Sequence, residues 1–128
     1  MAAGQIVRAD HGSVLLDLDG DGRETTGWVI LYLHIADEDR VRPGTFVETG
    51  ALLGHPSCRG GQATGTHVHV ARKYNGEWIP ADGVIPFNLS GWIARRGQAE
   101  YLGSLTRGDQ TVEACTCSTA ETAITADP

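Results

Sequence analysis

Two stretches of sequence decide the fold: WVILYLHI at residues 28–35 and THVHVARKY at residues 66–74. The first is a continuous apolar run rich in β-branched and aromatic residues, and a run of this length indicates a buried strand rather than a helix. In the second stretch polar and apolar residues alternate with a period of two, which predicts another strand. Asn75-Gly76 follows directly and predicts a tight hairpin turn.

The flanking segments extend this β pattern. Residues 5–18 predict two short strands around a turn at residues 10–12, and residues 37–54 predict short strands with glycine at each corner. The 17 glycines of this 128-residue chain favour many short strands over helices, and no segment has a helical period. The predicted fold class is all-β: a compact antiparallel β-sandwich or barrel with an irregular C-terminal extension.

The chain is expected to hold one core, with the domain over residues 1–86, an extension over residues 87–117 that packs on the core, and a flexible tail over residues 118–128. In the extension, Trp92 and Tyr101 are expected to pack on the core, the alternative being a wall-binding surface. Among the three cysteines, a bond from Cys58 to Cys115 or Cys117 is the more plausible disulfide if one forms, because a C-x-C pair bridges itself only under strain.

Charge and hydropathy exclude some partners. The net charge of −6, without a cluster of Lys and Arg, argues against nucleic acid, whose phosphates need a basic face. No apolar run is long enough to span a bilayer, so no membrane segment is expected. The N-terminal residues have neither a basic stretch nor an apolar one, so no signal peptide is recognised in this chain.

Three of the five histidines lie at the ends or on the faces of predicted strands. His67 and His69 are two residues apart on a strand, so they share one face with their Cα atoms roughly 6.5–7 Å apart. Such a pair can bind one metal ion, or merely line a solvated face. His34 ends the apolar run, where an imidazole without a partner is costly. These three are therefore the candidate site, and the other two are interpreted as loop residues: His11 and His55.

Several motifs occur in a fixed order along the chain. They are AGQIV at 3–7, LYLH at 31–34, V-x-P-G-x-x-V-x-x-G-x-x-L-G at 41–54, TGTHVH at 64–69 and KYNGEWIP at 73–80. From residue 3 to about residue 86 this ordered set resembles the core of the lysostaphin-type (LytM-like) zinc metallopeptidases, which hydrolyse peptide cross-links of bacterial peptidoglycan.

The resemblance implies a role for each of the three histidines. By that resemblance His69 is a zinc ligand, and His34 and His67 are catalytic residues that flank the reacting carbonyl. It also implies one zinc ion as cofactor, wall peptide as partner, and an extracellular or cell-envelope location. An imidazole, with a reference pKa of about 6.5, suits proton transfer near neutral pH.

The resemblance also implies two zinc ligands, a His and a nearby Asp, that would lie upstream of Met1. Three explanations stay open. The chain is part of a longer secreted precursor; or it is a degenerate, non-catalytic member that binds wall peptide or regulates another hydrolase; or His34, His67 and His69 together bind a metal ion.

Two further interpretations come from other motifs. Asp17-Leu18-Asp19-Gly20-Asp21-Gly22 matches the first half of a calcium loop, but Trp28 stands where an EF-hand needs a Glu. A shorter calcium site that uses Glu24 remains open beside the simpler interpretation as an acidic hairpin tip. The β pattern also resembles lipoyl, biotin and phosphotransferase carrier domains, which would use Lys73, or His34 with His67.

Overall fold

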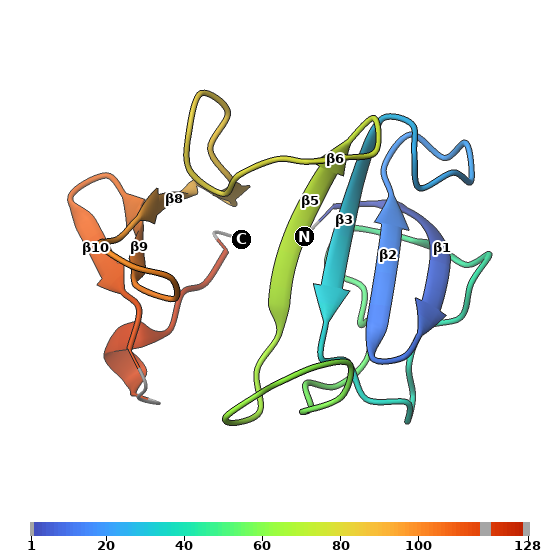
Figure 1. Ribbon diagram of the computed structural model, residues 1–128, viewed down its shortest axis with the longest axis horizontal. Helices are drawn as coiled ribbons and strands as arrows, with labels where there is room; N and C mark the ends of the chain where they lie inside the picture. The colour runs from blue at the N-terminus through green and yellow to red at the C-terminus, as the bar shows by residue number, and fades with distance from the viewer. Residues whose placement is uncertain (1, 116–118, 127–128) are drawn as a thin grey trace. The chain divides into compact units, whose positions relative to one another are not determined.

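The structure is a computed structural model that describes residues 2–115 and 119–126 (Figure 1). The chain divides into two compact units, Met1–Ile79 and Pro80–Pro128. Each unit is built on one antiparallel sheet. The all-β, antiparallel fold class is therefore confirmed.

The first unit contains a six-stranded sheet in the order β4-β1-β2-β3-β5-β6. Its strands are β1 (Gly4–Asp10), β2 (Ser13–Asp17), β3 (Trp28–Leu33), β4 (Phe46–Val47), β5 (His69–Tyr74) and β6 (Glu77–Trp78). Within the described residues β4 and β6 form its two edges, so the sheet does not close into a barrel. The predicted turns at residues 10–12 and 75–76 connect β1 to β2 and β5 to β6 as expected.

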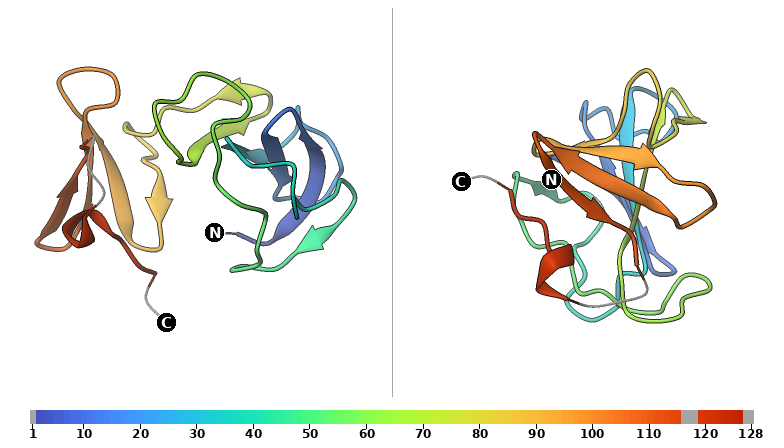
Figure 2. Two further views of the ribbon diagram at one scale, coloured as in Figure 1. Left: turned by 90° about the horizontal axis from the view of Figure 1, so that it is seen from below. Right: turned by 90° about the vertical axis from the view of Figure 1, so that its left-hand side faces the viewer.

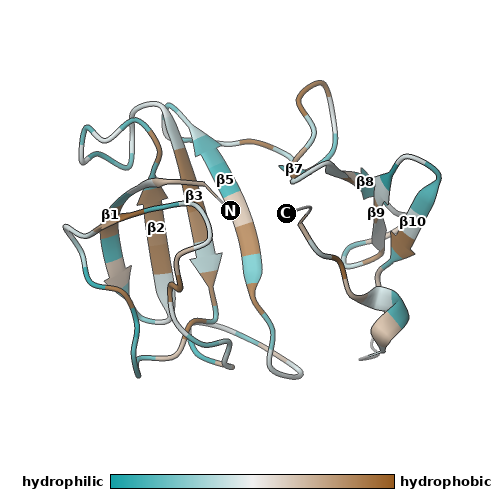
Figure 3. Cartoon of the chain, turned by 180° about the vertical axis from the view of Figure 1, so that it is seen from behind, coloured by the Kyte–Doolittle hydropathy of each residue, from teal (hydrophilic) through white to brown (hydrophobic). Residues whose placement is uncertain are grey.

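One face of this sheet carries the hydrophobic core. Strand pairing places Val14 opposite Tyr32 and Leu16 opposite Ile30, which puts all four on the same face. The buried cluster consists of Ile6, Val14, Leu16, Ile30, Tyr32, Ile35 and Val47. The hydropathy colouring shows the apolar residues running along β2 and β3 (Figure 3). Full burial of one such side chain contributes about 1.5–3 kcal/mol, so these strands anchor the unit.

The opposite face of the sheet carries an ion-pair network. Arg8 is the cross-strand neighbour of Leu15 in β1–β2, and Lys73 is that of Val29 in β3–β5, so each cation lies beside an apolar residue that is 1% exposed. Glu24 accepts from Arg8 Nε at 2.7 Å and lies 3.9 Å from Lys73 Nζ. The hydrogen bond from Arg8 to Glu24 raises the pKa of the arginine. The loop at residues 18–27 is thereby bound to the sheet.

The second unit contains a four-stranded sheet in the order β10-β9-β8-β7, whose strands are orange in the right-hand view of Figure 2. Its elements are β7 (Asn88–Leu89), β8 (Trp92–Arg96), β9 (Gly103–Arg107), β10 (Gln110–Glu113) and a short 3₁₀ helix η1 (Ala120–Thr122). This is more regular than the irregular extension that the sequence predicted. The Thr125 carbonyl accepts from both Trp92 Nε1 and Arg107, at 3.3 and 3.2 Å.

Several expectations about individual residues need correction. Tyr101 is 91% exposed rather than packed, whereas Trp92 is 5% exposed and lies under the Arg107 guanidinium at 4.6 Å. Cys58 is a free, exposed thiol and Cys115 is disulfide-bonded, so the expected bond from Cys58 is wrong. These two cysteines belong to different compact units. Cys117 lies outside the described residues. Among the described residues, no helix has the length and apolar character needed to cross a membrane.

Candidate functional site

The three candidate histidines come together at one end of the first sheet. Leu33 and His69 are paired across β3 and β5, so His34, the next residue after Leu33, lies beside His69. The ring centroids of His34 and His67 are 4.5 Å apart, and those of His34 and His69 are 6.5 Å apart. The structure therefore gathers all three side chains, and their catalytic and metal-binding roles remain predictions.

His34 is the buried member of the group. It is 3% exposed, and its backbone has a φ of 69°, in the left-handed region that favours glycine. Its Nδ1 donates to the Arg59 carbonyl at 2.7 Å. Because a carbonyl oxygen only accepts, the Nδ1 atom carries the proton, and the Nε2 atom of the neutral ring keeps its lone pair. Burial and a strained backbone at one residue are typical of functional positions.

The Nδ1 atom of His67, like that of His34, donates to a backbone carbonyl, but His67 lies at the surface. Its Nδ1 donates to the Gly65 carbonyl at 2.8 Å, and its backbone forms an isolated bridge with Ser57. Strand β5 begins only at His69, so the prediction of a strand already at residue 66 is wrong. The segment before His69 is a loop rich in Gly, Ser and Thr. The only β pairing in this loop is the isolated bridge between His67 and Ser57. His67 is thus an exposed residue whose Nε2 takes no part in this hydrogen bond.

His69 is the exposed first residue of β5. Within the part of the chain that the structure describes, its ring contacts the His34 ring and no hydrogen bond holds it. Either ring nitrogen can therefore bind a metal ion. A catalytic zinc site normally takes three protein ligands and one open position.

The three histidines do not complete such a zinc site. Among the described residues, the only three His, Cys, Asp or Glu side chains with ligand atoms within 4.8 Å of one another are Asp17, Asp19 and Asp21. The ring nitrogens of His34, His67 and His69 are too dispersed, so the interpretation that these three share one ion finds no support. The role of His69 as a zinc ligand therefore remains a prediction.

Comparison with known proteins supports the fold. Neither a family model nor a curated protein matches this sequence. Among solved structures, a novel M23 metalloprotease from the deep sea, pseudoalterin, superposes with a TM-score of 0.67 and is 22% identical. The alignment covers 88% of this chain and 66% of that one. The fold is M23-like. At this identity the likeness concerns the fold alone, and this chain spans about two thirds of the length of that protease.

The turn between β1 and β2 borders the histidine end of the M23-like sheet. His11 and Gly12 both have positive φ, at 46° and 79°, as a two-residue hairpin turn of this kind requires. A side chain at Gly12 would place its Cβ 2.8 Å from the backbone of Arg59 and Gly60, so glycine permits the close approach of the two loops. A hollow of about 370 Å³ lies here, lined by His11, Gly12, Asp37, Arg59 and Gly60.

Charged side chains order the rim of this hollow. Asp37 accepts from Arg59 and from Arg40, the latter at 2.9 Å. The hydrogen bond from Arg59 holds the pKa of Asp37 below its usual value. His55 lies 3.8 Å from Asp39, a contact that becomes an ion pair only when the imidazole is protonated. His11 and His55 both lie in loops, as the sequence indicated.

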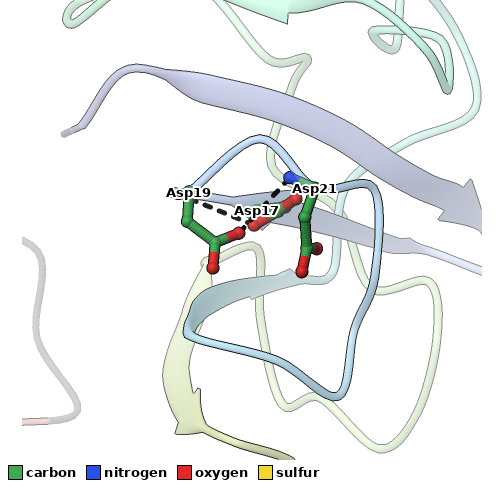
Figure 4. A group of neighbouring side chains, drawn as sticks. All are labelled: Asp17, Asp19 and Asp21. Carbon is green, nitrogen blue, oxygen red and sulfur yellow. Dashed lines mark hydrogen bonds between the residues drawn. The ribbon is translucent and has the colours of Figure 1, made fainter.

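The acidic loop after β2 forms a separate cluster (Figure 4). Asp17 is fully buried, and its two carboxylate oxygens accept from the backbone N–H groups of Asp19, at 3.1 Å, and Gly22, at 2.8 Å. A hydrogen bond with Asp17 raises the pKa of Asp19, and the Thr26 hydroxyl lowers that of Asp21. The Asp17 side chain therefore stabilises the conformation of the loop that follows it.

Two predicted side-chain roles do not fit this geometry. Glu24 is paired with Arg8, so the structure does not support a calcium site that uses Glu24. Lys73 lies within β5, two residues before the first residue of the Asn75-Gly76 turn, and its ammonium lies 4.9 Å from the Trp78 ring centre. It is thus not the hairpin-tip lysine that a lipoyl or biotin carrier needs.

Sequence reasoning missed Ser57 and Arg59, which hold His34 in place. The Ser57 amide and hydroxyl both donate to the His34 carbonyl, at 2.6 and 3.0 Å. Both residues stand in a loop of small, polar and glycine residues, and no local pattern marks them. Only the long-range hydrogen bonds to residue 34 distinguish them.

Proposed function

We propose that this chain forms the β core of a zinc metalloendopeptidase that hydrolyses peptide cross-links of bacterial cell-wall peptidoglycan outside the cell. The observation that carries the proposal is the convergence of His34, His67 and His69 at one end of an M23-like sheet. The proposal places this core in a longer precursor, in which a segment before Met1 supplies the zinc ligands that accompany His69.

The histidines supply proton transfer in this proposal. Zinc, when bound, polarises the scissile carbonyl and lowers the pKa of water. The Nε2 of His67 can accept a proton from an attacking water and return it to the leaving amine, because Nδ1 is held by the Gly65 carbonyl. His34 has the same proton arrangement and, being buried, keeps its orientation through the Arg59 carbonyl. General acid–base catalysis of this kind contributes about 10²–10⁴-fold to a rate.

Glycine-rich cross-links are the expected peptides. Glycine has no side chain to clash with a narrow groove and adopts backbone angles closed to other residues. The acidic net charge is compatible with a wall partner that carries amines.

The test is cleavage by the protein encoded in the longest reading frame that contains these residues. Purified peptidoglycan is incubated with it, and newly released amino groups are counted. Release should be abolished by a chelator and should fall at least about 100-fold in His67→Ala. His55→Ala, a loop histidine outside the cluster, is the matched control and should keep full activity. Equal release by His67→Ala would overturn the proposal.

A second candidate is a non-catalytic wall-peptide binder or a regulator of another hydrolase. This candidate is favoured because the ring nitrogens of His34, His67 and His69 lie too far apart to bind one metal ion, so the described residues do not complete a metal site. This candidate predicts that the protein sediments with peptidoglycan in the presence of a chelator and releases no amino groups. Metal-dependent release would eliminate it.

A further inference from the structure

Three hydrogen bonds connect His34 to the loop at residues 57–59, and a fourth, within the loop, closes the ring. Ser57 donates twice to the His34 carbonyl, from N at 2.6 Å and from Oγ at 3.0 Å. Arg59 N donates to Ser57 Oγ at 3.1 Å, and His34 Nδ1 donates to the Arg59 carbonyl at 2.7 Å. We call these four contacts the Ser57 clamp.

The Ser57 hydroxyl both donates and accepts a hydrogen bond in this ring. A hydroxyl has one hydrogen and two lone pairs, so donation to His34 leaves the oxygen free to accept from Arg59 N. That second bond restrains the peptide between residues 58 and 59, and the carbonyl that faces the His34 ring belongs to the next peptide along the chain. One side chain thus connects the backbone and the imidazole of the same histidine.

The clamp also explains how His34 keeps a left-handed backbone. A residue other than glycine with a φ near +69° costs about 1–2 kcal/mol and persists only where neighbouring groups hold it. Two donors on the His34 carbonyl provide that restraint.

The far side of the loop is fixed by close packing. A Cβ added to Gly60 would lie 2.5 Å from the His11 carbonyl, so the loop rests directly on the β1–β2 turn. The Arg59 side chain is held at Asp37, which also pairs with Arg40. The loop therefore has little freedom to move away from His34.

We infer that Ser57 is a positioning residue that sets the tautomer of His34. Its hydroxyl anchors the Arg59 N–H and thereby helps to keep the Arg59 carbonyl, in the next peptide, against Nδ1. The neutral ring then keeps its proton on Nδ1 and presents Nε2 as the basic atom. The use of Nε2 in catalysis rests on the proposed function, whereas the tautomer does not.

The test is the tautomer itself, read from ¹⁵N chemical shifts of the ring of the whole chain, with a chelator present and at a pH where the ring is neutral. In the native protein His34 should be mainly Nδ1–H. In Ser57→Ala the ratio of Nδ1–H to Nε2–H should fall about fivefold, the loss expected when one ordinary hydrogen bond is removed. Ser57→Thr keeps a hydroxyl and should have the native ratio of the two tautomers. Ser90→Ala, at an exposed turn of the second unit, should leave that ratio unchanged.

Two results would overturn the inference. One is a native His34 that is mainly Nε2–H, which can be seen even if Ser57→Ala fails to fold. The other is a folded Ser57→Ala protein with the native ratio. Neither readout requires zinc or cleavage, so failure of this inference and failure of the proposed hydrolase are separate outcomes.

Discussion

The three site histidines should contribute very differently to stability, although they lie side by side. His34→Ala removes an imidazole that is 3% exposed and leaves the Arg59 carbonyl without its donor. The lost hydrogen bond is worth about 1 kcal/mol, and the lost packing about as much again. We expect a loss of about 2 kcal/mol. His69→Ala, at an exposed position without a hydrogen bond among the described residues, should stay within about 0.5 kcal/mol of the native protein.

The left-handed backbone at residue 34 leads to a second expected difference in stability, between glycine and alanine at this position. Alanine keeps the strain at a φ of 69°, whereas glycine adopts this angle freely, so His34→Gly should be more stable than His34→Ala by about 1 kcal/mol. At most other strand ends the order would be reversed.

The assay is urea unfolding with a chelator present, followed through amide signals of Leu16 and Ile30, so that the second unit does not contribute. A His34→Ala variant that loses no more stability than His69→Ala would contradict this prediction, as would a His34→Gly variant that is less stable than His34→Ala.

Two further predictions concern buried groups of the first unit. Asp17→Ala should lower the free energy of unfolding by about 3 kcal/mol, because two backbone N–H groups lose their carboxylate acceptor. Calcium titration should leave the melting temperature of the native protein unchanged. A melting temperature that rises with calcium would show a cation site at this loop instead. Burial raises the pKa of Tyr32 to about 12, so above pH 10 the unfolded chain loses this proton before the folded one does. The free energy of unfolding should therefore fall by up to about 2.7 kcal/mol as the pH rises from 10 to 12. Urea unfolding midpoints measured over this pH range should fall less in Tyr32→Phe than in the native protein, because phenylalanine has no proton to lose.

Much of the first sheet could be predicted because its signals are local. The apolar run at residues 28–33 and the Asn75-Gly76 turn each specify their own conformation within a few residues. The gathering of His34 with His67 and His69 was predicted from strand ends together with the family resemblance.

The remaining features depend on contacts between distant residues. The Ser57 clamp joins residues 23 and 25 positions apart, and nothing near Ser57 in sequence marks it. The alternation of residues 66–74 continues through His67, yet the strand pairs with β3 only from His69, because Leu33 is the last residue of β3. In the second unit, frequent glycines interrupt the apolar pattern, so its four short strands give no clear period.

The proposed function requires His69 to bind a catalytic zinc ion. The measurement is the zinc content, after dialysis, of the protein from the longest reading frame that contains these residues, beside its His69→Ala variant. We expect one zinc ion per chain in the native protein and its loss in the variant, with the fold of both intact. A native protein without zinc, or a variant that keeps its zinc, would contradict the proposed function.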